Sequence, residues 1–161
     1  MKLASERMAE LGLTLPPVPV PVAAYVPAVR FSDLVFSSGQ VPMVDGQLQA
    51  VGLVGDAVSA EQAFECARTA ALNGLAAVAD AAGDLDVIAR IVKVVVYVAS
   101  APGFTRQPQV ANGASELLRE IFGVAGQHAR SAVGVSSLPL DAPVEVELVV
   151  AVGSTPTIHH F

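Results

Sequence analysis

The fold is decided by Ala129-Arg-Ser-Ala-Val-Gly-Val135, which a Pro-containing link joins to Val144-Glu-Val-Glu-Leu-Val-Val-Ala-Val152. Both stretches are rich in valine, and β-branched residues of this kind are enriched in strands. In the second stretch, apolar residues alternate with Glu145 and Glu147, so one face is apolar and the other carries the carboxylates. The two stretches therefore predict the last two strands of a half-buried sheet.

The first of these strands also divides its side chains between two faces. We assign Ser131, Val133 and Val135 to the core side, in line with the apolar side of the final strand. The face shared with the two glutamates then carries His128, Arg130, Ala132 and Gly134. A cation, two carboxylates and two very small residues on one face predict a shallow polar depression. The alternative is a partly exposed ion pair across the strands, which contributes less than ~1 kcal/mol.

The register between these strands limits which charges can meet. If the link turns near Pro139, Arg130 lies opposite Val149, and Glu145 lies ~13 Å further along the strand. Arg130 and Glu145 would then not touch within one chain. We expect them to converge on a ligand only across a subunit interface.

The remaining pattern predicts an α+β domain, a mixed β-sheet with two helices packed on one face. Ser59 and Gln62 have the spacing of a capping box, and Gly83 ends the helix that they begin. Cys66 is expected to be a small packing residue in that helix. The expected elements are a helix over 4–11, strands over 25–29 and 34–38, a helix over 59–83, a strand over 91–98, a helix over 112–122, and the two closing strands.

Two of these elements carry specific expectations about burial. In the strand over 91–98, Val92, Val94, Val96 and Val98 are expected to face the core, and Lys93 and Tyr97 the other side. In the N-terminal helix the expected apolar side consists of Leu3, Met8 and Leu11.

The length of 161 residues predicts one domain. We place a helical appendage and a Pro-rich extended spacer in residues 1–22, the domain in 23–153 and a tail in 154–161. Hydrophobic residues make up 53% of the chain and charged residues only 15%. So little polar surface predicts that part of the apolar excess is buried between subunits.

Charge and motifs exclude several classes of function. A net charge of −6 disfavours a nucleic-acid partner, which needs many Lys or Arg contacts to phosphate. The uncharged stretch 11–29 contains five prolines, so no membrane helix is expected there, and the chain is expected to be cytoplasmic. No nucleotide-binding or zinc-protease motif is present, and no metal is expected at His159 and His160.

Several segments together resemble one known family, the RidA/YjgF reactive-intermediate deaminases. They are Ala129–Val135, Leu138-Pro-Leu-Asp141, Val144-Glu-Val-Glu147, the early motif Ser38-Gly-Gln-Val-Pro42, and Tyr25 at the family's tyrosine position. The resemblance runs from about residue 25 to residue 152. The N-terminal extension and Ala111-Asn-Gly-Ala-Ser115 are similar to a lesser-known branch of that family.

The resemblance implies a chorismate-mutase-like homotrimer with ligand clefts between subunits. Its archetypal members hydrolyse enamines and imines to 2-keto acids and ammonia without a cofactor. By position, Arg130 matches the arginine that holds the substrate carboxylate, and Glu145 matches the glutamate that positions water. Tyr25 and Gly39 would line the pocket. His128 and Glu147 are further candidates, and a hydrogen-bonded structural histidine is the alternative for His128.

Two other functions stay open beside the deaminase. A trimeric module could bind small carboxylate metabolites in the same clefts without turning them over. An endoribonuclease is a label often attached to this family, and the acidic balance of the chain counts against it. The sequence also departs from the archetypes, because Ala132 stands where they often have cysteine.

Overall fold

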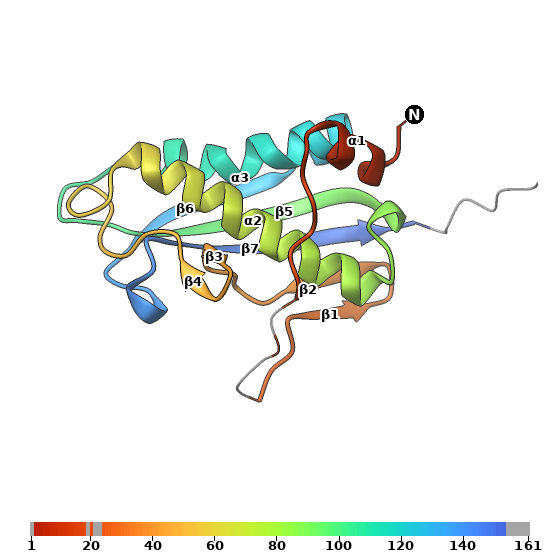
Figure 1. Cartoon of the computed structure of the whole chain (residues 1–161), viewed down its shortest axis with the longest axis horizontal. Helices are drawn as coiled ribbons and strands as arrows, with labels where there is room; N and C mark the ends of the chain where they lie inside the picture. The colour runs from red at the N-terminus through yellow and green to blue at the C-terminus, as the bar shows by residue number, and fades with distance from the viewer. Residues whose placement is uncertain (1, 19, 21–23, 154–161) are drawn as a thin grey trace, which may run out of the picture.

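The computed structural model describes residues 2–18, 20 and 24–153. Figure 1 shows one layer of sheet with the helices along one side of it. The elements, in chain order, are α1 (Ala4–Glu10), β1 (Ala28–Phe31), β2 (Leu34–Ser37), β3 (Met43–Val44), β4 (Gln47–Leu48), α2 (Ala60–Ala82), η1 (Leu85–Val87), β5 (Ile88–Ala99), α3 (Gln107–Phe122), η2 (Gly123–Gly126), β6 (Ala129–Val135), η3 (Pro139–Asp141) and β7 (Val144–Val152).

The main sheet has five strands in the order β1-β2-β7-β5-β6. All neighbouring pairs are antiparallel except β5 and β6, which are parallel and joined through α3. A parallel pair needs such a crossover connection. Helices α2 and α3 cover one face and the opposite face is left open (Figure 1). The predicted α+β architecture, a mixed sheet with two helices on one face, is confirmed.

The ends of α2 follow directly from local sequence. Ser59 Oγ accepts a hydrogen bond from the backbone N–H of Gln62, and the Gln62 side chain accepts one from Ser59 N. Gly83 closes the helix in the left-handed conformation with φ of 95°, which glycine adopts without steric cost. The capping box and the glycine stop are confirmed as predicted.

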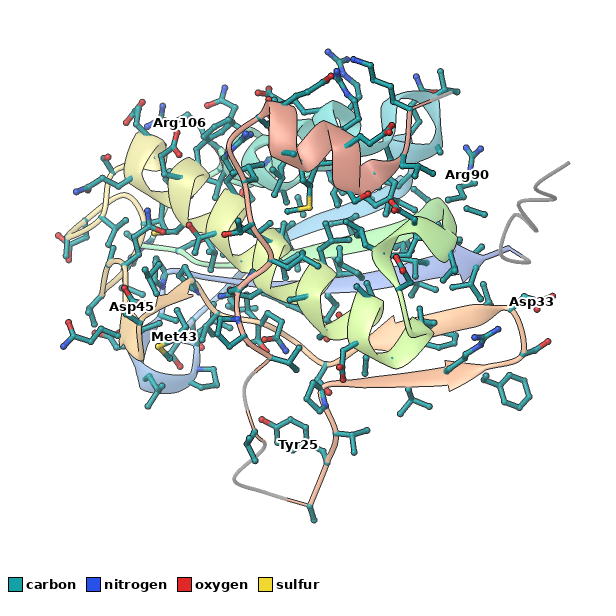
Figure 2. All side chains as sticks on the ribbon, turned by 45° about the vertical axis from the view of Figure 1, so that its right-hand side comes forward. Tyr25, Asp33, Met43, Asp45, Arg90 and Arg106 are labelled. Atoms are coloured by element: carbon teal, nitrogen blue, oxygen red, sulfur yellow. The ribbon has the colours of Figure 1, made fainter. Side chains whose placement is uncertain are left out.

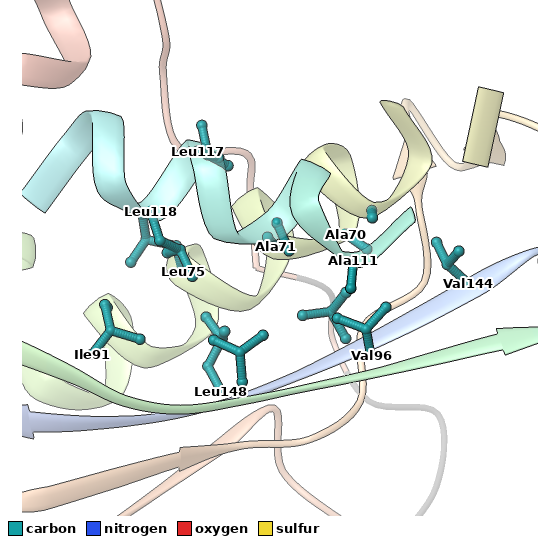
Figure 3. Close-up of a cluster of buried hydrophobic side chains, with 14 of the residues drawn as sticks. Ala70, Ala71, Leu75, Ile91, Val96, Ala111, Leu117, Leu118, Val144 and Leu148 are labelled. Atoms are coloured by element: carbon teal, nitrogen blue, oxygen red, sulfur yellow. The ribbon is translucent and has the colours of Figure 1, made fainter. Parts of the chain in front are cut away.

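The core lies between α2, α3 and the covered face of the sheet. Figure 3 shows Leu75 of α2 and Leu118 of α3 directed toward Ile91, Val96 and Leu148 on the strands. Alanines occupy much of the buried side of α2, and Gly113 of α3 lies against its backbone, so the two helices approach closely. Cys66 is buried in this core, as expected of a packing residue.

The pattern expected in β5 is wrong at one position. Val92 is 37% exposed, whereas Ile91, Val94 and Val96 are fully buried. The pairing with β7 shifts register between Ile91 and Lys93, which marks an irregularity of the β-bulge type. An extra residue interrupts the two-residue alternation. The sequence pattern alone does not locate it.

Several element boundaries differ from expectation, and β5 begins at Ile88 instead of residue 91. Strand β1 begins at Ala28 instead of residue 25, because Pro27 has no N–H to offer the ladder. Helix α3 begins at Gln107 instead of residue 112, with Pro108 in the first turn, where its missing N–H costs nothing. The short β3–β4 hairpin, which turns at Asp45 and Gly46, was not predicted.

The N-terminal helix is docked on the domain. Met8 is 4% exposed, and the Arg7 guanidinium donates to the carbonyl of Glu120 in α3. Leu3 and Leu11, which were expected on its buried side, are 44% and 38% exposed. The buried residues of this seven-residue helix are instead Ala4 and Met8, which lie four residues apart on one face. Of the predicted Pro-rich spacer, residues 19, 21 and 22 lie outside the described residues, as does the tail over 154–161.

Candidate functional site

Arg130 is held in place by the helix layer. It lies in β6, half-buried, and its Nη1 donates to Asn112 Oδ1 at 2.8 Å and to Ser115 Oγ at 3.1 Å. Asn112 and Ser115 are three residues apart in α3 and therefore share one face of that helix. Among the described residues, Nε and Nη2 of Arg130 make no hydrogen bond, which leaves this edge of the guanidinium free for a ligand.

Arg130 and the two glutamates lie on opposite faces of the sheet. Strand β5 separates β6 from β7, so the last two strands are not neighbours as expected. The Lys93 ammonium on the open face donates to Ser131 Oγ, and Val133 is 44% exposed. Ser131 and Val133 therefore belong to the open face, and the assignment of one shared polar face is wrong.

The reason is the edge position of β6. Its residues are exposed or half-buried along the whole strand, so no strong apolar alternation marks the core side. Helix α3 comes so close that a side chain at Gly134 would overlap Gln107 Nε2 at 2.8 Å. The small residues that were expected to open a depression beside the glutamates instead admit the helix.

His128 joins the Arg130 network through two hydrogen bonds. Its Nδ1 lies 2.6 Å from the carbonyl oxygen of Gly126, and its Nε2 lies 2.9 Å from Ser115 Oγ. Burial lowers the pKa of the imidazole, and the positive charge of Arg130 lowers it further, although the bond to Gly126 opposes both. A hollow of about 260 Å³ opens here, lined by Ser115, Arg119, Gly126, Gln127, His128 and Arg130.

Glu145 lines a second hollow. The volume of this hollow is about 310 Å³, and its lining includes Tyr25, Gly39, Gln40 and Glu145. Gly39 lies directly against the Glu145 carboxylate, where a Cβ would overlap Oε1. Burial raises the pKa of the Glu145 carboxyl, and the charge of Glu147 raises it further.

The chain segment around Gly39 is fixed from two sides. Gln40 forms a bridge with Val146 of β7, and Asn73 of α2 donates to the carbonyls of Val41 and Met43 at 3.0 Å. Tyr25 is held less firmly, because it precedes β1 and is 57% exposed (Figure 2). The structure thus brings Tyr25, Gly39 and Glu145 together.

Glu147 lies outside this hollow, on the open face. The Tyr97 hydroxyl donates to Glu147 Oε1 at 3.4 Å, a long hydrogen bond. Burial raises the pKa of Tyr97, and the two glutamates add to this effect. The negative charge of Glu147 therefore raises the pKa of both Glu145 and Tyr97.

The predicted site residues thus form two separate groups in one chain. One group holds an arginine with a free edge beside a histidine whose lowered pKa favours the neutral form. The other holds the half-buried carboxyl of Glu145 beside the backbone of Gly39. Asn112 and Ser115 were not predicted as site residues. Their three-residue spacing, which puts both on one face of a helix, was the sequence feature that could have indicated contact with Arg130.

A larger cavity of about 560 Å³ lies elsewhere, beneath the N-terminal segment. Its lining is mostly apolar and includes Met8, Leu13, Leu15 and Ala76, with Asp80 and Asp84 at its edge. Ser5 and Thr14 also line it, and the Ser5 hydroxyl donates to Asp86. Among the described residues, no helix is both long and apolar enough to cross a membrane.

Comparisons with known proteins cover nearly the whole chain. Residues 5–152 match the family model described as "YjgF/chorismate mutase-like, putative endoribonuclease". Protein TCP17 of Trypanosoma cruzi is 40% identical over 153 residues, which is 92% of this chain and 96% of that protein. A 2-iminobutanoate/2-iminopropanoate deaminase of Dermatophagoides farinae is 30% identical over 141 residues, 87% of this chain and 94% of that protein.

A solved structure agrees with these sequence matches. Protein Atu1372 of Agrobacterium tumefaciens, described as having unknown function, superposes with a TM-score of 0.86 at 42% identity. The match covers 93% of this chain and 92% of that one. The family model, the relatives and the fold agree over the same residues, and the chain belongs to the YjgF/chorismate mutase-like family.

Proposed function

We propose that this protein hydrolyses 2-imino acids to 2-keto acids and ammonia. The observation that carries the proposal is the state of Arg130. Its Nη1 is fixed by Asn112 and Ser115, while Nε and Nη2 have no partner among the described residues. A guanidinium edge held in this way suits a carboxylate, which it can bind through two parallel hydrogen bonds.

The reaction needs little beyond orientation and a water molecule. A protonated imine is already electrophilic, so no cofactor is required by the chemistry. The protein must fix the carboxylate and bring water to the adjacent carbon. Glu145 is the group proposed to position that water, because its raised pKa makes the carboxylate a stronger base than an exposed one.

We further propose that the two groups of residues meet between subunits of a homotrimer. Arg130 and Glu145 lie on different strands and opposite faces, so one chain cannot direct both at one small ligand. The open sheet face exposes an apolar set that favours self-association: Val29, Phe31, Phe36 and Val133. Arg130 of one copy would then face Tyr25, Gly39 and Glu145 of the next.

The similarity to the mite 2-iminobutanoate/2-iminopropanoate deaminase supports the substrate class. The family description also contains the term endoribonuclease, but the charge of this chain does not favour RNA as a substrate. With a net charge of −6, the chain has few cations to neutralise a phosphate backbone.

An imine-hydrolysis assay tests the proposal. An amino-acid oxidase would generate imino acids in situ, and keto-acid release would be followed with wild type, Arg130→Ala and Arg106→Ala. Arg106 is an exposed arginine paired with Glu61 at 3.9 Å, and it serves as the matched control. We expect acceleration by wild type and Arg106→Ala, and a loss of ~100-fold or more in Arg130→Ala.

Other results of this assay and of two further measurements would overturn the proposal. No acceleration by wild type across short, branched and acidic side chains would exclude the deaminase. Calorimetric binding of a stable 2-keto acid that disappears in Arg130→Ala would then assign the cleft to a carboxylate-binding module. RNA cleavage that survives nuclease removal and requires Arg130 would favour the endoribonuclease.

A further inference from the structure

Leu140 is an exposed apolar residue in a strained backbone conformation. It lies in η3, between β6 and β7, with φ of 59° and ψ of 18°, which is the left-handed region. A Cβ crowds the neighbouring carbonyl oxygen in this region, so leucine seldom adopts it. The residue is also 70% exposed. Neither burial in the core nor backbone preference therefore accounts for a leucine at this position.

The surrounding backbone holds Leu140 in this conformation. The N–H groups of Asp141 and Ala142 each donate to the carbonyl three residues earlier, at 3.1 Å. The Gly52 N–H donates to the Asp141 carbonyl at 2.8 Å. Strained residues persist only where their surroundings fix them, and they concentrate at binding sites. The fixed backbone at Leu140 therefore suits a residue that contacts a ligand.

Leu140 lines the same hollow of about 310 Å³ as Glu145. This volume is at the lower end of the range for small-molecule sites, roughly 300–1,000 Å³. Among the described residues that line the hollow, Glu145 carries the only formal charge, and none is a cation. Much of the remaining lining is apolar: Val20, Pro27, Val41, Met43 and Pro139. The hollow thus offers an apolar wall and one carboxylate.

In the proposed cleft, the substrate side chain meets this wall. The reacting carbon lies within one-water reach of Glu145, and the substrate carboxylate is bound by Arg130 of another copy. Two substituents of that carbon remain, the iminium nitrogen and the side chain. The iminium is cationic and is attracted to the Glu145 carboxylate. The apolar part of the hollow, which includes Leu140, is therefore left for the side chain.

We propose that Leu140 is a specificity-determining residue, which selects 2-imino acids with extended apolar side chains and rejects those with acidic side chains. The inference rests on the proposed deaminase function and adds its substrate class. An apolar side chain gains contact with Leu140 and leaves water. A second substrate carboxylate would enter a hollow that holds Glu145 and no cation, so it would be repelled and unpaired.

The imine-hydrolysis assay measures this selectivity directly. Matching oxidases generate the imines of leucine, methionine, alanine and glutamate in situ, and keto-acid release above the uncatalysed rate gives kcat/KM for each. For wild type, we expect kcat/KM for the leucine and methionine imines to exceed that for the alanine imine by ~10-fold and that for the glutamate imine by ~100-fold. Equal values for all four imines, or a preference for the glutamate imine, would overturn the inference.

Two substitutions test whether the Leu140 side chain causes the selectivity. Leu140→Ala keeps the strained backbone and removes the apolar contact, so kcat/KM should fall ~10-fold for the leucine imine and by less than about threefold for the alanine imine. Leu140→Lys supplies a cation and should raise kcat/KM for the glutamate imine ~10-fold. Unchanged selectivity in both variants would overturn the inference.

Val124 provides the matched controls. It is an apolar residue of similar exposure, 75%, and it does not line the hollow. Val124→Ala and Val124→Lys make the same changes of side chain as the two Leu140 variants. Both should leave the ratios of kcat/KM among the four imines unchanged, and a change equal to that of the Leu140 variants would contradict a local effect in the hollow.

Leu140→Gly separates the side chain from the conformation of the loop. Glycine adopts this backbone conformation without steric cost, so the variant should have a higher Tm than Leu140→Ala and the same selectivity. A change of selectivity in Leu140→Gly alone would assign the effect to the loop and overturn the inference. In sedimentation equilibrium, Leu140→Ala should keep the mass of wild type. Dissociation with an equal loss for every imine would instead make Leu140 a packing residue between copies.

The two proposals can fail separately. Wild-type hydrolysis that requires Arg130 but does not distinguish the leucine imine from the glutamate imine overturns the selectivity and leaves the deaminase. Absence of imine hydrolysis in wild type overturns both.

Discussion

At the scale of single residues, the Glu145 carboxylate leaves no room for a side chain at Gly39. A Cβ at this position would overlap Glu145 Oε1 and lie 2.7 Å from its carboxyl carbon. The side chain of Glu145 must therefore move if Gly39 gains even one methyl group. The pair is coupled, so substitutions at the two positions should not be additive.

A double-mutant cycle tests this coupling. Gly39→Ala should lower the free energy of unfolding by about 1–3 kcal/mol, since it overpacks a fixed segment. In a Glu145→Ala background the cost should shrink to about 0.5 kcal/mol or less. Gly153→Ala, where a Cβ would meet only Ala89 Cβ at 3.5 Å, is the control. Equal costs in both backgrounds, measured by urea denaturation, would contradict the contact.

The raised pKa of Glu145 makes a prediction about pH. The folded chain holds this proton more tightly than the unfolded chain, so stability falls as pH rises from the ordinary carboxyl range through the folded pKa. Glu145→Gln removes this loss. Both proteins should be diluted until they are monomeric. At neutral pH the variant should then have a higher Tm than wild type, and this difference in Tm should become smaller at acid pH.

The control for the pH series is Ser136→Ala, because Ser136 is an exposed loop residue without a carboxyl group. Its Tm difference from wild type should not change across the same pH range. A Glu145→Gln variant that is less stable than wild type at neutral pH would show that the carboxylate is stabilised in the folded chain.

At the scale of elements, the packing of α3 against α2 depends on Gly113. A Cβ there would overlap the carbonyl oxygen of Phe64 and lie 3.3 Å from Arg68 N, and both atoms belong to the α2 backbone. Backbone atoms inside a helix cannot move aside as a side chain can. The position of α3 matters to the site, because this helix carries Asn112 and Ser115.

Gly113→Ala should therefore cost about 3 kcal/mol or more, despite the better helix propensity of alanine. Gly74→Ala in α2 is a matched control, since its Cβ would meet only side-chain atoms, of Leu148 at 3.1 Å and of Gln40 at 3.9 Å, and no backbone atom. Chemical denaturation of both variants gives the comparison. A cost at Gly113 no larger than that at Gly74 would refute the backbone contact.

At the scale of the whole molecule, one sheet face is covered by helices and the other is open (Figure 1). The open face combines exposed apolar residues such as Phe36 with the Glu145 group, while the Arg130 group lies on the covered side. A second copy that covers the open face would bury apolar area and complete the proposed cleft at once.

Phe36→Asp should disrupt such an assembly. A charge buried at the interface without a partner is costly, so the trimer expected for wild type should dissociate, and imine hydrolysis should fall with it. Val124→Asp places the same charge at a residue 75% exposed in η2, and it should change neither property. Sedimentation equilibrium gives the masses, and a monomeric wild type that is fully active would exclude the intersubunit cleft.

Much of the fold could be predicted because its signals are local. The capping box of Ser59, the stop at Gly83 and the apolar alternation of β7 each depend on residues a few positions apart. The helix start at Gln107 and the bulge in β5 were missed, since both depend on how the segment meets its neighbours. The resemblance nominated Arg130, Glu145, Tyr25 and Gly39, whose roles remain proposals.

The sequence by itself determined the longer helices and strands, because capping, periodicity and turn residues act within a few positions. Only the tertiary structure decided that β5 lies between β6 and β7. Its register aligns Arg130 with the buried Val94 and Leu148, so Arg130 lies on the covered face and Glu145 on the open one. Pairing between distant strands follows from the packing of the whole sheet, and an edge strand such as β6 has no strong pattern to reveal it. The same packing joins Asn112, Ser115 and His128 to Arg130.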